Sequence, residues 1–403
     1  MTAPTVSVVI VSHGRPASLG ICLTGVGQID YPNFEIVIVA DQSGIDAVNA
    51  HALGDQVKLV LFDEMNISAA RNAGVAAAAG EIIAFIDDDA IPEPTWLTHL
   101  IAPFADESVA VAGGYVIGRN GISFQWKART VSPDAHTEDL ILDYDRPQVF
   151  EGSRTRAIKT EGTNMAVRRD VLVHLGGFDP AFRFYLDETD LNMRIGKAGL
   201  KTAIVPLAQV HHGFAPSARR RDDRVPRDLF EIGASLAVYL CKHDGNLAAF
   251  PLERTAQRHR LLSHMVAGRL LPSDVAKILT TFDVGWDAGR ARIFGQLNDL
   301  GKANDFKLLK PKMSPERLVI SGRIWERRKL MASAVEATKA GRRVSLMLLS
   351  PTVAYHHIRF VADGYWLQSG GLFGKSLRSD PIWRFWRFAD RVARECQRIA
   401  SVR

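Results

Sequence analysis

The chain has 403 residues, of which 47% are hydrophobic and 23% charged, a composition that allows two or three folded domains and excludes a disordered protein. Its start lacks the basic and apolar regions of a secretory signal, and no apolar run reaches the roughly 18 residues of a membrane-spanning helix. The three cysteines lie far apart, which excludes a disulfide framework and a zinc knuckle. We therefore expect a cytoplasmic protein.

The two parts of the chain carry opposite net charges. Residues 1–150 contain 7 Lys or Arg and 19 Asp or Glu, whereas residues 151–403 contain 43 and 25. An acidic part that binds a metal and a basic part that meets an anionic partner would explain this difference. Anionic lipid, lipid-linked phosphate and nucleic acid are the candidates for that partner, and a chance difference between solvated faces is the alternative.

Short apolar runs alternate with helix-length segments in the first third of the chain. The segments between the runs include 17–28 and 67–79. Alternating strands and helices predict an α/β fold with a mainly parallel sheet and helices on both of its faces. Such sheets bind ligands at the carboxyl ends of their strands. The runs that we interpret as strands are 6–12, 35–40, 57–62, 82–86 and 109–117.

The remainder of the chain predicts further parts. A short helix and one more strand, Thr202–Val205, follow a turn near Gly176, and an apolar helix covers residues 229–243. Residues 317–350 have the pattern of a strand, a helix and a strand. We predict a first domain over residues 1–245, a helical connecting segment over residues 246–312, and a small α/β unit with a C-terminal amphipathic helix over residues 313–403.

The amphipathic tail helix is expected over Ile382–Ile399. Its apolar side chains, among them Phe385 and Trp386, fall on one face, and its arginines fall on the other. Such a helix either lies on an anionic membrane surface or packs against the core of the protein itself. The glycine-rich stretch GGLFGKS at residues 370–376 has the wrong spacing for a phosphate-binding loop, and we interpret it as a turn.

Three consecutive carboxylates, Asp87, Asp88 and Asp89, end the buried strand 82–86. Side chains alternate along a strand, so Asp87 and Asp89 lie on one side and Asp88 on the other. Like charges at the end of a buried strand repel one another unless a cation neutralises them. A hard divalent cation that carries a diphosphate fits these ligands, whereas the triplet alone would also fit a solvated acidic turn.

Three other polar side chains stand where a nucleotide could reach them. Arg15 lies in a turn that opens a helix after the first strand, where phosphate binds readily. Asp41 follows the second strand and either accepts hydrogen bonds from a base or ribose or caps a helix. Arg71 lies on the helix 67–79, whose other side chains are mostly small and apolar. It is either a salt-bridge partner or a nucleotide contact. No GxGxxG motif opens a helix here, which disfavours a dinucleotide dehydrogenase.

Six stretches of sequence follow one another along the first half of the chain. They are VSVVIVSHGRPASL, EIVIVADQS, NISAARNAG, GEIIAFIDDDAIPEPTWL, EGTNMAVRRDVL, and GGFDPAFRFYLDETDLNMR followed by VPLAQVHHGF. In order and spacing they resemble the family 2 glycosyltransferases of the GT-A fold, over about residues 5–214. The resemblance implies an α/β nucleotide-binding sandwich with a mainly parallel sheet.

The resemblance also implies roles for donor-side residues. Ser12 and Arg15 would lie near the nucleotide, Asp41 would contact its base, and Arg71 would lie beside it. Asp87 would contact the ribose or the sugar.

A metal site and an acceptor side are implied in the same way. Asp89 would bind Mn²⁺ or Mg²⁺ across the diphosphate, and a histidine after the last strand of this region would complete the metal shell. Both His211 and His212 match that position, and we choose His211. The acceptor-side loop of the family matches Gly162, Thr163 and Asn164.

A catalytic base is expected in the acidic pair Asp187 and Glu188. The resemblance favours Glu188, and on a helix that begins near Asp187 this residue shares a face with Leu191 and Ile195. Apolar neighbours disfavour the charged form of a carboxylate, which predicts a raised pKa that suits a general base. Asp187 remains the rival, and an acid cluster that only stabilises a helix amino end is the plain alternative.

These features together predict a metal-dependent transferase. It would move a sugar from a nucleoside diphosphate sugar to a hydroxyl of a glycan or lipid-linked glycan, with inversion, in the synthesis of cell-surface polysaccharide or glycolipid. We expect no nucleic acid partner, and we leave open peripheral contact with an anionic membrane at its inner face. A sugar-phosphate nucleotidyltransferase is the rival enzyme, although its glycine-rich signature is missing. A non-catalytic member that binds nucleotide sugar or membrane is the other alternative.

Overall fold

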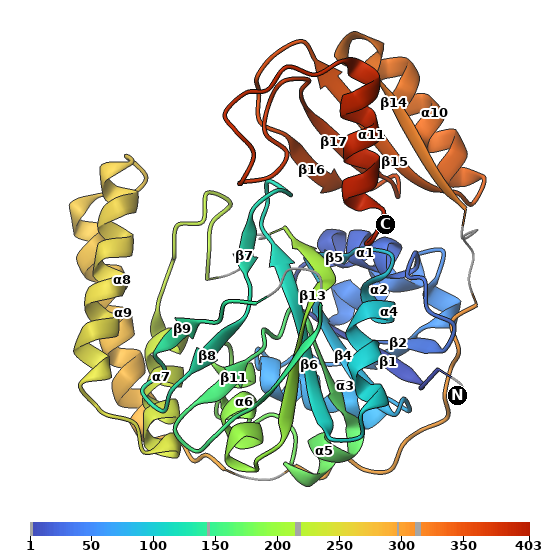
Figure 1. Cartoon of the computed structure of the whole chain (residues 1–403). Coiled ribbons are helices and arrows are strands. Elements are labelled where there is room, and N and C mark those ends of the chain that lie inside the picture. The colour runs from blue at the N-terminus through green and yellow to red at the C-terminus, as the bar shows by residue number, and fades with distance from the viewer. Residues whose placement is uncertain (1–2, 143–145, 214–218, 296–297, 311–315) are drawn as a thin grey trace.

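The computed structural model describes residues 3–142, 146–213, 219–295, 298–310 and 316–403, with elements labelled as in Figure 1. The strands are β1 Val6–Ser12, β2 Phe34–Ala40, β3 Lys58–Leu61, β4 Ile82–Asp87, β5 Ala90–Pro92, β6 Val109–Ile117, β7 Phe124–Trp126, β8 Arg129–Val131, β9 Thr137–Asp139, β10 Gln148–Glu151, β11 Ala157–Lys159, β12 Met165–Arg168, β13 Lys201–His212, β14 Arg317–Arg323, β15 Arg343–Ser350, β16 His357–Phe360 and β17 Trp366–Gly371. The α-helices are α1 Pro16–Val26, α2 Gln42–Asn49, α3 Ile67–Ala77, α4 Trp96–Ile101, α5 Arg169–His174, α6 Asp187–Lys197, α7 Phe230–His243, α8 Ala249–Val266, α9 Pro272–Arg290, α10 Arg327–Lys339 and α11 Phe388–Ile399. No helix among the described residues is long and apolar enough to cross a membrane.

The centre of the main sheet is formed by parallel strands that are buried on both faces. Strands β4, β1, β2 and β3 lie side by side in that order and run in the same direction. Because side chains alternate along a strand, Val8 of β1 packs in the cluster that contains Leu19 of α1, whereas its neighbour Val9 packs in the cluster that contains Val75 of α3. Helices therefore cover both faces, which explains why these strands are continuous apolar runs.

The other half of the main sheet is mixed. Strand β12 runs antiparallel to β4 and β6, and β13 runs parallel to β6. The short strand β5, which follows the acidic triplet, pairs with the end of β13, so that His212 stands opposite Ala90. Strands β11, β8 and β9 form a small separate sheet. This arrangement brings the end of β13 beside the end of β4.

Each strand predicted in the first third of the chain is present, with ends that differ from the prediction by at most one residue. The strand predicted as Thr202–Val205 is much longer, because β13 continues to His212. The hydrogen-bonding register of β13 against β6 shifts between Val205 and Gln209, in the stretch that contains Pro206. A proline and a register shift interrupt the apolar alternation after Val205, so the sequence pattern stops there although the strand continues.

Helices α7, α8 and α9 form a helical layer at the left of Figure 1, and their apolar cluster also includes Val131 of β8, Ala157 of β11 and Met193 of α6. Helices α7 and α9 pack closely where three glycines meet the facing backbone. A Cβ atom added to Gly233, Gly285 or Gly289 would come within 2.1, 2.0 or 2.3 Å of a carbonyl oxygen of the other helix. Only a residue without a side chain permits this approach, so the close packing of α7 against α9 depends on these glycines.

The C-terminal unit is a second α/β structure, with strand order β14–β15–β17–β16 and its own apolar cluster. The predicted fold class is therefore confirmed: a mainly parallel α/β sandwich, a helical segment and a small C-terminal α/β unit. The tail helix is shorter than predicted, because α11 begins only at Phe388. Ile382 and Phe385 lie before it. The domain boundaries stay a prediction, and the one near residue 312 lies outside the described residues.

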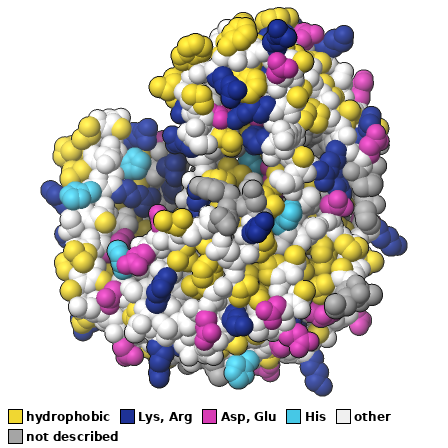
Figure 2. Space-filling model, viewed as in Figure 1, with side chains coloured by type: hydrophobic (Ala, Val, Ile, Leu, Met, Phe, Trp, Pro, Cys, Tyr) yellow, Lys and Arg dark blue, Asp and Glu magenta, His cyan; other side chains and the backbone are white. Residues whose placement is uncertain are grey.

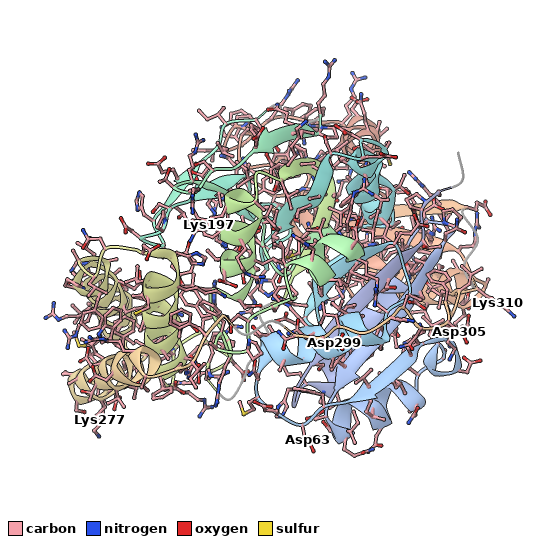
Figure 3. The ribbon with its side chains drawn as sticks, turned by 90° about the horizontal axis from the view of Figure 1, so that it is seen from below. Asp63, Lys197, Lys277, Asp299, Asp305 and Lys310 are labelled. Atoms are coloured by element: carbon pink, nitrogen blue, oxygen red, sulfur yellow. The ribbon has the colours of Figure 1, made fainter. Side chains whose placement is uncertain are left out.

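Several contacts join the C-terminal unit to the rest of the chain, among them the hydrogen bond from Nε2 of Gln28 to the carbonyl of Gly364 (2.6 Å). An extended segment returns along the underside of the main sheet, where Figure 3 labels Asp299, Asp305 and Lys310, and the backbone N–H of Leu309 in this segment donates to the carbonyl of Phe34 (2.9 Å). Another contact is the buried ion pair between Arg403 and Glu93.

Arg403 inserts its guanidinium between the C-terminal unit and the main sheet. Its Nε donates to Oε2 of Glu93 at 2.7 Å, and its Cζ lies 4.0 Å from the ring centroid of Trp366. Oε1 of Glu93 also lies 2.9 Å from Nε2 of His211. Burial alone would raise the pKa of Glu93, but Arg403 and His211 outweigh it and lower the pKa to about 2.

Glu93→Gln is expected to lower the free energy of unfolding by about 3 kcal/mol at pH 7, because the pKa of Glu93 in the folded chain lies well below its ordinary value. The ion pair stabilises the folded chain above the ordinary pKa of 4.5, and this stabilisation is lost as the pH falls from 4.5 towards 2. In urea unfolding, the free energies of unfolding of variant and parent should therefore differ clearly at pH 7 and much less near pH 3. The exposed Glu138→Gln should leave stability unchanged at both values. Equal stability of parent and Glu93→Gln at neutral pH would contradict the assignment.

Candidate functional site

The aspartates at the end of β4 point in two directions, as strand alternation predicts. Asp87 and Asp89 form a group with His212 of β13, in which one ligand atom from each residue lies within 4.8 Å of the others. Nε2 of His212 is 3.2 Å from Oδ1 of Asp89. Two carboxylates and an imidazole form a donor set that suits Mn²⁺ and accepts Mg²⁺. Of the two predicted metal-site histidines, His212 is the one that the fold brings to Asp89.

His211 points away from this group, which corrects our choice of His211 as the metal ligand. Its Nε2 atom faces Oε1 of Glu93 at 2.9 Å, and its ring packs 4.6 Å from the ring of Trp366, centroid to centroid. Consecutive residues of a strand face opposite sides, so only one of the two histidines can reach Asp89. The role of His211 in the structure is to join β13 to the C-terminal unit.

Asp88 faces the loop that follows β1 and is fully buried. Its carboxylate accepts a hydrogen bond from Ser12 Oγ at 2.6 Å and pairs with Nη2 of Arg15 at 2.5 Å. Nη1 of Arg15 lies 3.5 Å from Oδ2 of Asp89. Burial raises the pKa of Asp88 to about 7, although Arg15 opposes this rise. Ser12 and Arg15 are thus held against the aspartate triplet, with the side chain of Arg15 26% exposed.

Two predicted site residues serve the scaffold in this structure. The carboxylate of Asp41 accepts backbone hydrogen bonds from Gly14 (2.8 Å) and Gly44 (2.9 Å), and it caps the amino end of α2. These donors outweigh burial and lower its pKa. Asn164 is fully buried, accepts from Trp96 Nε1 at 2.8 Å and donates to two main-chain carbonyls. Neither side chain is among those that line the cavity described below.

Arg71 links the donor side of the site to helix α6. It is 4% exposed, its Nη1 pairs with the carboxylate of Asp187, and its Nη2 lies 3.5 Å from Oδ1 of Asp87. Thr163 donates a hydrogen bond to the other oxygen of Asp87. The backbone of Gly162 lies against the guanidinium, which a Cβ atom there would meet at 2.4 Å. Arg71 is therefore a salt-bridge partner that fixes Asp87, and Gly162 is the residue that leaves room for it.

Glu188, the predicted base, stands at the first turn of α6 beside a buried lysine. Nζ of Lys159 lies 3.2 Å from Oε1 of Glu188 and 2.9 Å from Oε2 of Glu161. Burial alone would raise the pKa of Glu188, but Lys159 and then Arg71 outweigh it and lower the pKa to about 2. The expected rise in this pKa was wrong, because Leu191 and Ile195 do not set the surroundings of the carboxylate. Glu188 is ionised at neutral pH.

A single large cavity joins these groups. Its volume is about 1570 Å³, and Ser12, Arg15, Asp89, His212 and Glu188 line it. Ligand sites commonly measure about 300–1,000 Å³, so this cavity has room for two substrates at once. Asp87, Asp187, Arg71, Gly162 and Thr163 line it as well.

Several residues of the cavity carried no signal in the sequence. Lys159 and Glu161 lie in or next to the short strand β11, and Arg129 of β8 pairs with Glu161. Arg220 and Arg260 line the cavity from the segment before α7 and from α8. The basic run before α7 was noticeable as charge, but nothing in its pattern indicated that it faces a cavity.

The chain is similar in sequence to known glycosyltransferases. The family model "Glycosyl transferase family 2" matches residues 7–176. The O-antigen biosynthesis protein RfbC of Myxococcus xanthus is 26% identical over 55% of this chain and 18% of its own length. The glucosyl-dolichyl phosphate glucuronosyltransferase of Haloferax volcanii is 30% identical over 43% of this chain and 56% of its own length. The chain thus spans well under two thirds of these relatives.

Among solved structures, the mannosyltransferase PcManGT from Pyrobaculum calidifontis, in complex with GDP-Man and Mn²⁺, covers 72% of this chain and 88% of its own at 17% identity, with a TM-score of 0.44. Because this score lies below 0.5, the assignment rests on the sequence match. The fold and the cavity define an α/β protein with a candidate metal and nucleotide site. The predicted resemblance is confirmed over residues 7–176, which match the glycosyltransferase family 2 model.

Proposed function

We propose that this chain transfers a sugar from a nucleoside diphosphate sugar to a hydroxyl acceptor, with inversion at the anomeric carbon and with bound Mn²⁺ or Mg²⁺. One observation carries the proposal: the group formed by Asp87, Asp89 and His212 opens into the same cavity as the carboxylate of Glu188. A metal site and a basic carboxylate in one space large enough for two substrates are the parts that glycosyl transfer needs.

The donor half of the reaction belongs to the end of β4. Asp89 and His212, with Asp87 beside them, would hold the metal, and a bound metal would neutralise the charge of the departing diphosphate. Arg15 adds a fixed positive charge at the same wall, held in place by Asp88. Asp87, oriented by Arg71 and Thr163, is placed to contact the ribose or the sugar.

The acceptor half belongs to α6. Glu188 takes the proton of the acceptor hydroxyl as that oxygen bonds to the anomeric carbon and the bond from this carbon to the diphosphate oxygen breaks. Because the attacking oxygen and the leaving group stand on opposite faces of the sugar, the configuration inverts. Lys159 keeps Glu188 ionised before the acceptor arrives, and by lowering its pKa it also makes the carboxylate a weaker base. Asp187 is the rival for the base, because burial raises its pKa to about 8, and we prefer Glu188 because Asp187 is 2% exposed and already paired with Arg71.

The setting we propose is the synthesis of cell-surface polysaccharide or glycolipid, with a glycan or lipid-linked glycan as acceptor. The names of the two relatives, one for O-antigen biosynthesis and one for a glucosyl-dolichyl phosphate, support this class of acceptor. We propose a cytoplasmic protein that contacts the inner face of an anionic membrane. The excess of Lys and Arg in residues 151–403 supports that contact.

A thermal-shift screen of the full chain against UDP-, GDP- and dTDP-sugars with Mn²⁺ tests the donor class. We expect one nucleotide to stabilise the chain in the presence of the metal and not after chelation. That donor should then be hydrolysed slowly to the nucleoside diphosphate without an acceptor. Formation of a nucleotide sugar from a nucleoside triphosphate and a sugar phosphate would instead identify a nucleotidyltransferase. Metal-dependent binding without any turnover would identify a non-catalytic protein.

Lys159→Met is expected to raise the pKa of Glu188, because Lys159 is the strongest of the groups that lower it. A carboxylate with a pKa near 2 stays ionised throughout the working range, whereas one with a raised pKa gains a proton as the solution becomes acidic. The variant should therefore lose kcat/KM as the pH falls from about 7 to 5, while the parent should not. Lys197→Met, at the far end of α6, is the matched control. Parallel pH profiles for parent and Lys159→Met would refute this role of Lys159.

A further inference from the structure

The C-terminal unit exposes one end of its sheet. Strands β14, β15 and β17 run parallel, and Arg323, Ser350 and Gly371 end them at the same edge. The opposite edge meets the rest of the protein, since Trp366, at the start of β17, packs against His211 and Arg403. In Figure 1 helix α11 runs from the outer part of the unit down to the main sheet. Most of the loops at the carboxyl edge therefore face away from the main sheet, and the loop after β17 also reaches it through Arg378, whose Nε donates to Oγ of Ser123 at 2.7 Å.

The exposed apolar side chains of the unit gather in these loops. Every large hydrophobic side chain of the described residues 316–403 that is more than half exposed lies in one of them. They are Trp325 (68%) after β14, Val353 (53%) and Tyr355 (55%) after β15, and Ile382 (69%), Trp383 (65%) and Phe385 (73%) between β17 and α11. An isolated exposed apolar residue needs no explanation, but six at one edge of one sheet do.

The same loops are strongly basic. Residues 324–329, 351–356 and 372–387 contain seven Lys or Arg and two acids. Both acids are engaged: Glu326 accepts from the backbone N–H of Arg323 at 2.9 Å, and Asp380 pairs with Arg394. Figure 2 shows Lys and Arg side chains interspersed with hydrophobic ones over the C-terminal unit. The uncompensated positive charge is thus mixed with the aromatic side chains.

We infer that the carboxyl edge of the C-terminal sheet, formed by residues 324–329, 351–356 and 372–387, docks on the surface of an anionic lipid bilayer. Trp and Tyr favour the boundary between headgroups and acyl chains, and each Lys or Arg near an anionic surface strengthens binding by on the order of fivefold. An apolar protein partner would not account for the positive charge. A nucleic acid would not account for Ile382 and Phe385, which offer no hydrogen bonds to bases.

This surface replaces the amphipathic helix that the sequence predicted. The inward side of α11 carries Arg391, Glu395 and Ile399, which are at most 4% exposed, and Glu395 is tied to Ser376 and Gln368 by hydrogen bonds of 2.6 and 2.9 Å. Helix α11 is therefore part of the folded unit and holds the preceding loop in place. In this last part of the chain, the residues that we expect to meet lipid are those of the loop before α11.

Flotation of the full chain with vesicles tests the inference without any assay of catalysis. The parent chain should bind vesicles of phosphatidylglycerol mixed with phosphatidylcholine, and should bind phosphatidylcholine alone at least tenfold more weakly. Trp383→Ser with Phe385→Ser should reduce binding to the mixed vesicles at least tenfold, because both side chains are exposed. Arg328→Glu with Arg387→Glu should reduce it similarly and should weaken its dependence on salt.

Leu61→Ser with Ile141→Ser is the matched control, since these side chains are 60% and 99% exposed but lie in the first domain. This pair should bind vesicles as the parent does. Failure of the parent to float, or equal flotation of parent and Trp383→Ser with Phe385→Ser, would overturn the docking surface. Neither result would bear on the proposed transfer reaction, because sugar transfer to a soluble acceptor is measured separately.

Discussion

Glu188→Gln is expected to lower the rate of sugar transfer by about 10²- to 10⁴-fold, the usual contribution of a general base. The change removes the ability to take a proton but keeps the size of the side chain and an oxygen for Lys159, which lies 3.2 Å from the carboxylate. Because Glu188 stands on the acceptor side, donor affinity should change less than twofold. Single-turnover rates with the preferred donor, together with titration of the nucleoside diphosphate in the presence of Mn²⁺, measure the two quantities.

Two further variants sharpen this test. Glu253→Gln changes another carboxylate that lines the cavity from α8, and it should retain most of the activity. Asp187→Asn breaks the ion pair with Arg71 and should weaken donor binding as well as turnover, since Arg71 also contacts Asp87. If Glu188→Gln keeps the rate of the parent while Asp187→Asn loses it with donor affinity intact, the base is Asp187.

Asp89→Ala is expected to abolish the dependence of nucleotide binding on metal. The parent should bind the nucleoside diphosphate about 10- to 100-fold more tightly with Mn²⁺ than with chelator, and this ratio should fall close to one in the variant. The physical reason is the loss of one of three ligands in a group whose ligand atoms lie within 4.8 Å of one another. Calorimetric titration with and without Mn²⁺ gives both affinities.

The two neighbouring histidines provide the control for this experiment. His212→Ala should reduce the metal dependence, because its Nε2 atom lies 3.2 Å from Asp89, whereas His211→Ala should retain it. His211→Ala should instead lower stability, because Glu93 loses a partner. Retention of the full metal effect in Asp89→Ala, or its loss in His211→Ala alone, would show that the ligand set is different.

Strand periodicity was sufficient to predict which aspartates of the triplet face the same side. A strand has only two faces, and Asp87 to Asp89 come at the end of one. The same rule could not decide between His211 and His212. The register of β13 shifts between Val205 and Gln209, so the count of alternating residues along the strand does not indicate which face His212 takes. Because of this register shift, alternation along the strand does not show which of the two histidines faces Asp87 and Asp89.

The surroundings of Glu188 were also beyond the reach of the sequence. Lys159 is 29 residues away along the chain and belongs to β11, a strand of three residues without a recognisable pattern. Helical periodicity identified the apolar neighbours on α6, but the charge that sets the pKa comes from another element. Local patterns predict which face of a helix is buried, whereas the protonation of a side chain depends on contacts made across the fold.

Arg71 has one more consequence, because it is a counter-ion shared by two carboxylates, Asp87 at the donor end and Asp187 at the acceptor end. A metal bound to Asp87 would offset the charge of that carboxylate, so that the guanidinium would interact more strongly with Asp187. Binding of metal at Asp87 would therefore change the electrostatic surroundings of α6 before an acceptor is present. The free energies of substitutions at Asp87 and Asp187 should accordingly be non-additive, and their coupling would measure how strongly the two halves of the cavity communicate.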